Sequence, residues 1–222
     1  MDVKERKEGM KTIVCFGDSN THGYDAQTNG RFDWHTRWTG QLQSRLREGY
    51  AVREEGLSGR TTVFDDPFFE GLCGLQLIYP CLMSHEPVDL LIVMLGTNDV
   101  KQRFSATPEN ITKGMERLLT KVLSAPECWA DRPRILLVCP PPIEEGLEQT
   151  AVYGEMGVGC REKSLQLSPL YRELASRLQI DFLDAGSIEG VSMNPIDHMH
   201  LNREAHAALA AAVEAAVRRI LA

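Results

Sequence analysis

Three short segments contain the residue types that acyl-transfer chemistry uses. They are Gly17-Asp18-Ser19, Gly96-Thr97-Asn98-Asp99 and Asp197-His198-Met199-His200. A serine can act as a nucleophile, an asparagine amide can face a developing negative charge, and an Asp–His pair can act as an oriented base. Each segment taken alone is also ordinary turn chemistry, because Gly, Asp, Ser and Asn favour turns and helix caps.

The position of each residue within its segment indicates which chemical role it could take. Ser19 stands at an expected strand-to-helix turn, where its own backbone N–H can face an anion near the helix N-terminus. Asn98 follows the most apolar run, and its amide can enter the same crevice. The Asp197-x-x-His200 spacing lets the carboxylate bond Nδ1–H of the imidazole while Nε2 points outward. His198 is better interpreted as a surface or pocket-rim histidine.

The elements that must position these residues follow from hydrophobic periodicity. Apolar runs alternate with segments of helical period, which predicts a parallel sheet covered on both faces. The expected strands are residues 12–16, 50–54, 90–95, 135–138 and 180–183. The expected helices begin near Trp38, after a Thr107 cap, near Leu167, and after an Asn202 cap. Five strands with intervening helices predict a three-layer α/β/α domain.

Two stretches, 60–69 and 140–163, carry no clear element pattern and are long for connections. Long loops in compact domains are usually functional, and ligands in open α/β sheets lie beyond the carboxyl ends of the strands. We found no repeat, low-complexity tract or linker. The sequence therefore predicts one domain over residues 11–222, preceded by a flexible tail over residues 1–10.

Composition excludes several classes of protein. The chain has 222 residues, a net charge of −7 and 43% hydrophobic residues, which are values of an ordinary globular protein. An acidic chain is a poor partner for nucleic acid or an anionic membrane. The charged N-terminus is not a secretory signal, so we expect six reduced cysteines and a cytoplasmic location. We found no zinc-like Cys/His spacing and no dinucleotide fingerprint, so no metal or cofactor is expected.

Taken together, the segments resemble the SGNH hydrolases, the GDSL-type esterase superfamily. The matching blocks are Gly17-Asp18-Ser19, Gly59 within Gly-Leu-Ser-Gly-Arg-Thr, Gly96-x-Asn98-Asp99, and Asp197-x-x-His200. Within that superfamily the sequence resembles the bacterial arylesterase and acyltransferase branch. There is one departure, because Asn20 stands where the name GDSL has Leu, at a position that varies in the superfamily.

The resemblance implies roles for these residues. Ser19, His200 and Asp197 would be the catalytic triad, and Ser19, Gly59 and Asn98 would form the oxyanion hole. Asp18 is expected to support its turn and Asp99 to order its own loop. The resemblance also implies a flavodoxin-like strand order 2-1-3-4-5 and a homo-oligomer, with residues 140–163 the segment expected to reach a neighbour.

The predicted function is hydrolysis of small carboxylic esters through an acyl-enzyme, with transfer of the acyl group to alcohols as a further activity. A carbohydrate O-acetyl esterase on the same fold is the alternative. A non-catalytic binding module is disfavoured by the intact set of five residues. A nucleotide-binding flavodoxin-like protein is disfavoured by the missing phosphate loop.

Overall fold

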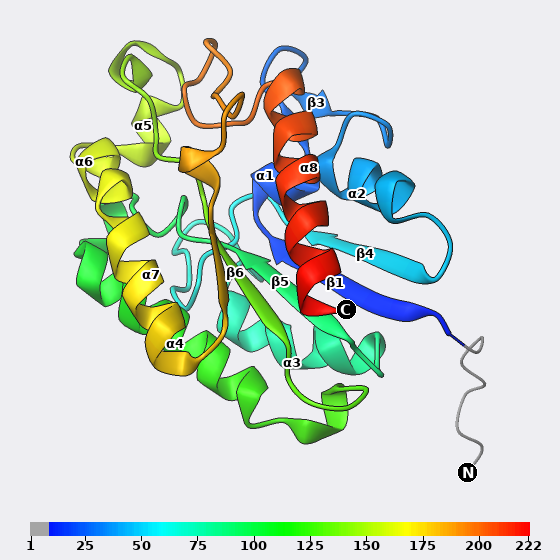
Figure 1. The fold of residues 1–222 in the computed structure, drawn as a ribbon. Helices are drawn as coiled ribbons and strands as arrows, with labels where there is room; N and C mark the ends of the chain where they lie inside the picture. Colours follow the sequence, from blue (N-terminus) through cyan, green and yellow to red (C-terminus); the bar gives the residue numbers. More distant parts are fainter. Residues whose placement is uncertain (1–8) are drawn as a thin grey trace.

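The computed structural model describes residues 9–222, so the expected tail lies outside the described residues except for Gly9 and Met10. Its centre is a parallel sheet of five strands in the order β4-β1-β5-β6-β7 (Figure 1). This is the predicted order 2-1-3-4-5. The strands are β1 (Lys11–Gly17), β4 (Tyr50–Gly56), β5 (Leu90–Met94), β6 (Ile135–Cys139) and β7 (Asp181–Asp184).

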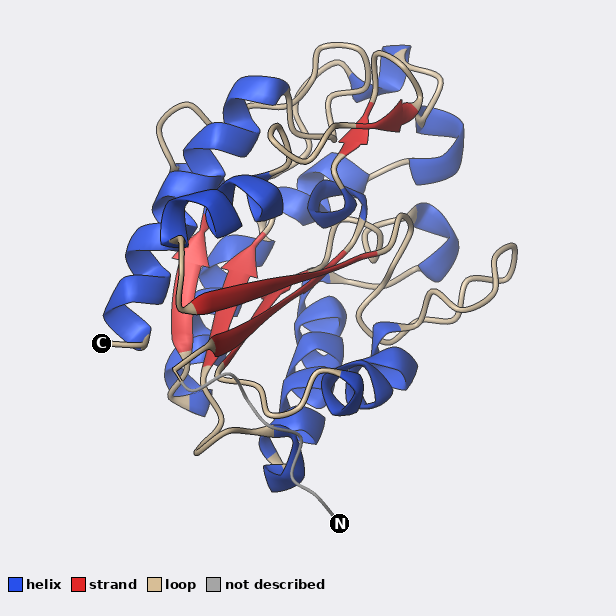
Figure 2. Ribbon diagram, turned by 90° about the vertical axis from the view of Figure 1, so that its right-hand side faces the viewer, coloured by secondary structure: helices blue, strands red, loops and turns tan. Residues whose placement is uncertain are grey.

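Helices cover both faces of the twisted sheet, as Figure 2 shows, which confirms the three-layer prediction. The short helices near the carboxyl edge are α1 (Ser19–His22), α5 (Tyr153–Met156) and α6 (Cys160–Leu165). The longer ones are α2 (Trp38–Leu46), α3 (Gly74–Ser84), α4 (Pro108–Leu123), α7 (Leu167–Leu178) and α8 (Arg203–Ile220).

Alternation along the central strands divides the core in two. On β1, Val14 and Phe16 face the α3/α4/α7 side, whereas Ile13 and Cys15 face the α2/α8 side. Successive side chains of a strand point to opposite faces, so a strand buried on both faces is apolar throughout. All five residues of β5 are buried for this reason.

Side-chain caps start the two longest helices where the sequence predicted them. Thr107 accepts a hydrogen bond from the Asn110 N–H ahead of α4, and Asn202 accepts one from the Ala205 N–H ahead of α8. Such caps satisfy backbone donors that the first helical turn leaves free. The α8 cap fixes the point at which the chain leaves the segment containing Asp197 and His200.

Periodicity missed other elements. Helix α3 contains Pro80, which interrupts the helical signal, and the hairpin of β2 (Tyr24–Asp25) and β3 (Gly30–Arg31) is too short to show alternation. The stretch 140–163 contains α5 and the start of α6. All six cysteines are free thiols and five of them are buried. Among residues 9–222, no helix has both the length and the apolar composition needed to cross a membrane.

Candidate active site

The predicted chemical residues meet at the carboxyl edge of the sheet. Ser19 is the first residue of α1, immediately after β1, and the Asp18 side chain caps this helix by accepting from the Asn20 N–H at 2.9 Å. Helix α1 lies directly against the end of β4. A Cβ on Gly56 would stand 2.1 Å from the backbone nitrogen of His22, so this approach requires glycine.

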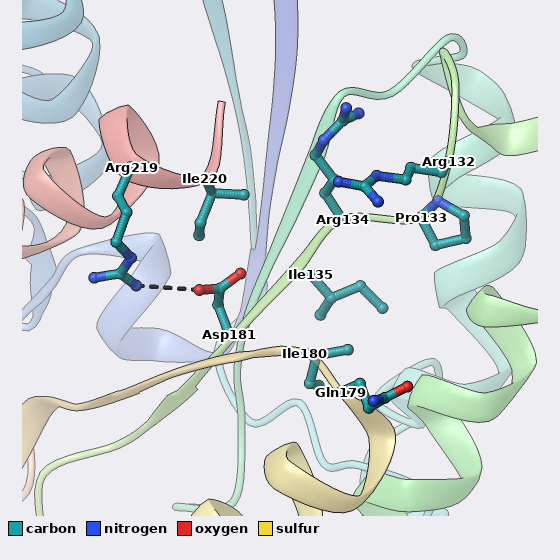
Figure 3. A pocket seen from close by; sticks show the side chains of 9 residues that line it. All are labelled: Arg132, Pro133, Arg134, Ile135, Gln179, Ile180, Asp181, Arg219 and Ile220. Carbon is teal, nitrogen blue, oxygen red and sulfur yellow. Dashed lines mark hydrogen bonds and ion pairs between the residues drawn. The ribbon is translucent and has the colours of Figure 1, made fainter. Parts of the chain in front are cut away.

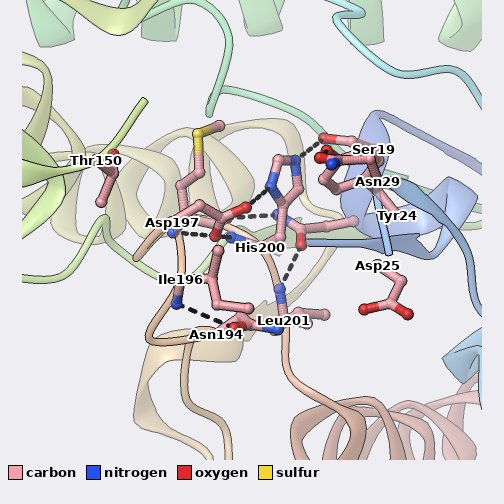
Figure 4. Close-up of polar contacts among 12 residues, drawn as sticks. Ser19, Tyr24, Asp25, Asn29, Thr150, Asn194, Ile196, Asp197, His200 and Leu201 are labelled. Atoms are coloured by element: carbon pink, nitrogen blue, oxygen red, sulfur yellow. Dashed lines mark hydrogen bonds and ion pairs between the residues drawn. The ribbon is translucent and has the colours of Figure 1, made fainter. Parts of the chain in front are cut away.

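Ser19, His200 and Asp197 form one hydrogen-bonded chain (Figure 4). The Ser19 hydroxyl lies 2.8 Å from His200 Nε2, and His200 Nδ1 lies 2.6 Å from Asp197 Oδ2. An ionised carboxylate accepts only, so Nδ1 carries the proton and Nε2 is free to accept from the serine. All three residues are buried, and the Tyr24 ring packs 4.5 Å from the imidazole. This is the geometry of an activated serine nucleophile.

The Asp197 carboxylate is held by several donors. Its Oδ1 accepts from the backbone N–H groups of Met199 and His200 at 3.2 and 3.0 Å. Burial raises the pKa of this carboxyl, but the hydrogen bonds and charge of His200 outweigh it, and the net pKa is lowered. The carboxylate therefore stays ionised beside the imidazole, as an orienting group must.

A small cavity of about 180 Å³ opens in front of the serine. Ser19, Gly59 and Asn98 all line it. Gly59 has φ +87°, in the left-handed region that favours glycine. Asn98 Nδ2 donates to the Arg60 carbonyl at 3.2 Å, which fixes the amide and leaves its second N–H free of that bond. Three segments distant in sequence thus supply potential donors to one cavity.

Asp18 and Asp99 both accept hydrogen bonds from backbone N–H groups at this edge. Asp99 accepts from the backbone N–H of Thr62 at 2.9 Å and from the Thr62 hydroxyl, so its side chain ties the loop after β5 to the loop after β4. The sequence predicted that Asp99 would order its own loop, and the bonds to Thr62 are an addition to that prediction. Burial raises the pKa of both carboxyls to about 6, and the Asp18 charge adds to the rise at Asp99.

Two charged residues of the cavity wall escaped the sequence analysis. Lys101 is buried, and its ammonium lies 3.9 Å from Asp66 Oδ2. Burial lowers the pKa of Lys101. Glu155, from α5, lies on the same wall and pairs with Arg103. Lys101 follows the Gly96–Asp99 motif by two residues, which is the signal that would have drawn attention to it. Glu155 gives no comparable signal.

A larger hollow of about 290 Å³ lies at the opposite edge of the sheet, where β6 and β7 begin (Figure 3). Its walls carry Arg132, Arg134 and Arg219, and Arg219 pairs with Asp181 at 3.1 Å. No serine, cysteine or histidine is among its lining residues. It therefore lacks the serine–histidine pair of the other cavity, and its one carboxylate, Asp181, is paired with Arg219.

One group of side chains consists of residue types that bind metal ions. Glu55, Cys81 and His85 place their ligand atoms within 4.8 Å of one another, and Glu55 Oε1 lies 2.6 Å from His85 Nε2. The sequence analysis missed it because the carboxylate comes from β4 and the other two from the end of α3. The buried Arg60 guanidinium donates to the Glu55 backbone carbonyl beside this cluster, and burial raises the pKa of the Cys81 thiol to about 12, so the thiol is protonated at neutral pH.

A buried Ser–His–Asp chain at the carboxyl edge of a parallel sheet is the arrangement found in hydrolases of the serine type. The comparison of sequences makes the class specific: the chain belongs to the GDSL-like lipase/acylhydrolase family, whose model matches residues 15–208. This confirms the resemblance to the SGNH hydrolases. The comparison with curated proteins gave no match.

Three solved structures similar to this chain are esterases by their titles. The native aryl esterase of M. smegmatis is 37% identical, with 95% of this chain and 99% of that chain covered and a TM-score of 0.88. A carbohydrate acetylesterase family member from Sinorhizobium meliloti is 39% identical, with 96% and 99% covered and a TM-score of 0.86. Est24, a carbohydrate acetylesterase from the same species, is 37% identical, with 94% and 99% covered and a TM-score of 0.84. The family and these structures support a carboxylic ester hydrolase.

Proposed function

We propose that this protein is a serine esterase that cleaves small carboxylic esters through an acyl-enzyme. The observation that carries the proposal is the buried chain of hydrogen bonds from Ser19 Oγ through the His200 ring to Asp197. A serine hydroxyl is a weak nucleophile until an oriented base removes its proton. These three side chains supply the nucleophile, the base and the orienting carboxylate.

The reaction proceeds in two acyl-transfer steps. Ser19 Oγ attacks the ester carbonyl while its proton passes to His200 Nε2, and the imidazolium then gives that proton to the leaving alcohol. Water repeats the sequence on the acyl-enzyme and releases the acid. Asp197 holds the proton on Nδ1 throughout and stabilises the imidazolium. If an alcohol replaces water in the second step, the product is a new ester.

The oxyanion that forms at each step needs donors already in place. We assign this role to the backbone N–H groups of Ser19 and Gly59 and to the amide of Asn98. Ser19 stands at the N-terminus of α1, and the Asn98 amide is held by the Arg60 carbonyl. Donors fixed before the reaction stabilise the transition state without reorganising.

The size and lining of the cavity support a small substrate. About 180 Å³ leaves room for a short acyl group, and Val152, Met156 and Met199 give the cavity apolar walls. Two of these come from the stretch 140–163, so part of the substrate contact comes from the long connection after β6. We infer a preference for acetyl to butyryl esters over long-chain esters.

A carbohydrate O-acetyl esterase is a second candidate, and the charged wall favours it. Lys101 is a donor and the Glu155 carboxylate an acceptor on the same cavity. Sugar hydroxyls need both kinds of partner, whereas an aryl alcohol needs neither. Two of the similar structures are carbohydrate acetylesterases by title, which also supports this candidate.

The test is turnover of p-nitrophenyl acetate, butyrate and octanoate by the wild type, Ser19→Ala and Ser58→Ala. Ser58 lines the same cavity without a hydrogen bond to the histidine, so it is the matched control serine. We expect turnover that falls with chain length, is abolished by Ser19→Ala and persists in Ser58→Ala. Equal rates for wild type and Ser19→Ala would refute the mechanism.

Acetylated sugars separate the two candidates. If the protein is an aryl esterase, Lys101→Met and Glu155→Gln should change kcat/KM on p-nitrophenyl acetate and on acetylated sugars by the same factor. For a sugar esterase, the two variants lose kcat/KM on acetylated sugars by about tenfold or more and keep it on p-nitrophenyl acetate, because the lost contacts are charged hydrogen bonds. Added alcohol with detection of the ester product tests acyl transfer.

A further inference from the structure

Asn20 is buried beside the nucleophile, and its side chain reaches the segment that carries the base. Its Nδ2 donates to the Met199 carbonyl at 3.2 Å, and its Oδ1 accepts from the Leu201 N–H at 2.9 Å. Met199 and Leu201 are the two neighbours of His200 in the chain. One amide therefore bonds to backbone groups on both sides of the histidine.

Apart from the contact of His200 Nε2 with the Ser19 hydroxyl, the other side-chain bonds of this segment do not reach the nucleophile. Asp197 bonds the backbone of its own turn, Asn194 accepts from the Ile196 N–H, and Glu144 accepts from the Met193 N–H. These bonds shape the segment 193–200 internally or attach it to the connection after β6. The Asn20 amide is different because Asn20 directly follows Ser19 in the chain. It spans 181 residues of sequence to join the two reacting groups.

We propose that Asn20 is a positioning residue that sets the distance and direction between Ser19 Oγ and His200 Nε2. The proposal rests on the proposed function, in which this contact transfers the proton. The family takes its name from a Gly-Asp-Ser-Leu motif, and leucine at this position has no group for either bond. In this chain the departure from the motif connects the residue after the nucleophile to the backbone on both sides of the base.

Replacing Asn20 by leucine separates an effect on the position of His200 from an effect on substrate binding. Asn20→Leu removes both bonds without replacing any residue that lines the cavity, because Asn20 is not among the lining residues. Displacing a catalytic group by about 1 Å costs up to about 10²-fold in rate. We expect kcat to fall by about 10²-fold on p-nitrophenyl acetate, with KM nearly unchanged.

Asn20→Asp adds a readout that a purely structural role would not move. A protonated aspartic acid has one O–H donor and one carbonyl acceptor, the same pair as the amide, whereas the carboxylate only accepts. The ratio of variant to wild-type kcat should therefore rise as the pH falls and the buried acid takes up its proton. Asn20→Leu should show a flat ratio over the same range.

Asn202→Ala is the control for general weakening of the same segment. It removes the cap of α8 two residues after His200 and leaves the Asn20 bonds in place. We expect a lower Tm with kcat within about twofold of wild type, since a lost cap costs about 1 kcal/mol of stability. A loss of kcat in Asn202→Ala equal to that in Asn20→Leu would overturn the positioning role.

A spectroscopic measurement keeps this proposal distinct from the proposed function. The His200 Nδ1–H proton, bonded to Asp197, should give a downfield proton NMR signal in the wild type and in Asn202→Ala. In Asn20→Leu we expect that signal to shift or broaden. An unchanged signal together with unchanged kcat refutes the role of Asn20 while the esterase stands. If the wild type cleaves no ester, the proposed function fails, and the NMR signal still tests whether Asn20 holds the imidazole.

Discussion

Two hollows lie at opposite edges of the sheet, and the smaller of them is the one lined by a serine and a histidine. The one at the amino edge is larger, about 290 Å³ against about 180 Å³, and is rich in arginine (Figure 3). The one at the carboxyl edge is small, but the buried Ser19 and His200 line it. Figure 4 shows the hydrogen bonds of these two residues. Volume therefore says less about function here than the groups that the walls present.

The difference follows from the way a parallel sheet is built. Loops that leave the carboxyl ends of neighbouring strands meet at one edge, so Ser19, Gly59 and Asn98 come together after β1, β4 and β5. At the amino edge the chain enters β6 and β7, and Asp181 is already used by Arg219. Variants at the two edges should therefore have very different effects on catalysis.

The largest effect is expected at Asp197. Asp197→Asn keeps the shape of the side chain but takes away the negative charge that fixes the proton on His200 Nδ1. Loss of the correct tautomer costs about 10⁴-fold in kcat. Steady-state kinetics on p-nitrophenyl acetate measures the loss, with circular dichroism to show that the variant folds. A loss under tenfold would show that Asp197 does not orient the base.

The next effect is expected at Asn98. Asn98→Ala removes the amide assigned to the oxyanion and should lower kcat by about 10²–10³-fold, the usual value of one such donor. KM should change little, because the donor acts mainly in the transition state. Equal losses in binding and in kcat would instead point to a role in holding the substrate.

A pH-dependent effect on stability is expected at Asp99. Burial raises its pKa to about 6 in the folded protein, from an ordinary value near 3.8. A carboxyl with a raised folded pKa stabilises the fold below the ordinary pKa and loses that contribution as the pH rises through about 6. Asp99→Asn keeps an oxygen for Thr62 and does not titrate. Relative to wild type, the variant should gain about 1–3 kcal/mol in the free energy of unfolding between pH 4 and 7.

Urea unfolding at intervals from pH 4 to 7 measures this difference. Burial lowers the pKa of His206 to about 3, so its contribution has the opposite sign and is lost as the pH falls from 6.5 toward 3. Both proteins contain His206, and its contribution cancels in the difference between them. A difference that stays constant with pH would contradict the buried titration of Asp99.

The smallest effect is expected at the amino edge. Arg219→Ala removes an exposed ion pair with Asp181, and such pairs contribute about 0–1 kcal/mol. We expect kcat/KM within about twofold of wild type on every ester tested. A tenfold change would show that the amino edge influences catalysis at the carboxyl edge.

Much of the framework was predictable because it depends on local patterns. The run Leu90–Leu95 is apolar throughout, which predicted a buried strand, and the caps Thr107 and Asn202 mark helix starts by their own chemistry. The elements that were missed lack such patterns. Pro80 interrupts α3, and the β2/β3 hairpin has two residues per strand.

The candidate site divides in the same way. Ser19 and the Asp197-x-x-His200 pair were found because their spacing is local, and Gly59 and Asn98 because they fall in the blocks of the resemblance. Glu155 and the Asp99–Thr62 bond were not found, since nothing in the neighbouring residues indicates them. In the sequence, Asn20 was recognisable only as a residue that departs from the Gly-Asp-Ser-Leu motif.

The sequence by itself determined the alternation of strands and helices, the chemical types at the strand ends and the local geometry of the Asp–x–x–His turn. These depend on periodicity, turn preferences and short spacings, which act within a few residues. Only the tertiary structure decided which groups share the cavity and what holds His200 against Ser19. The Asn20 amide makes its two bonds across 179 and 181 residues of chain, separations over which no local pattern carries information. The packing of α1 at the end of the sheet brings the two segments together.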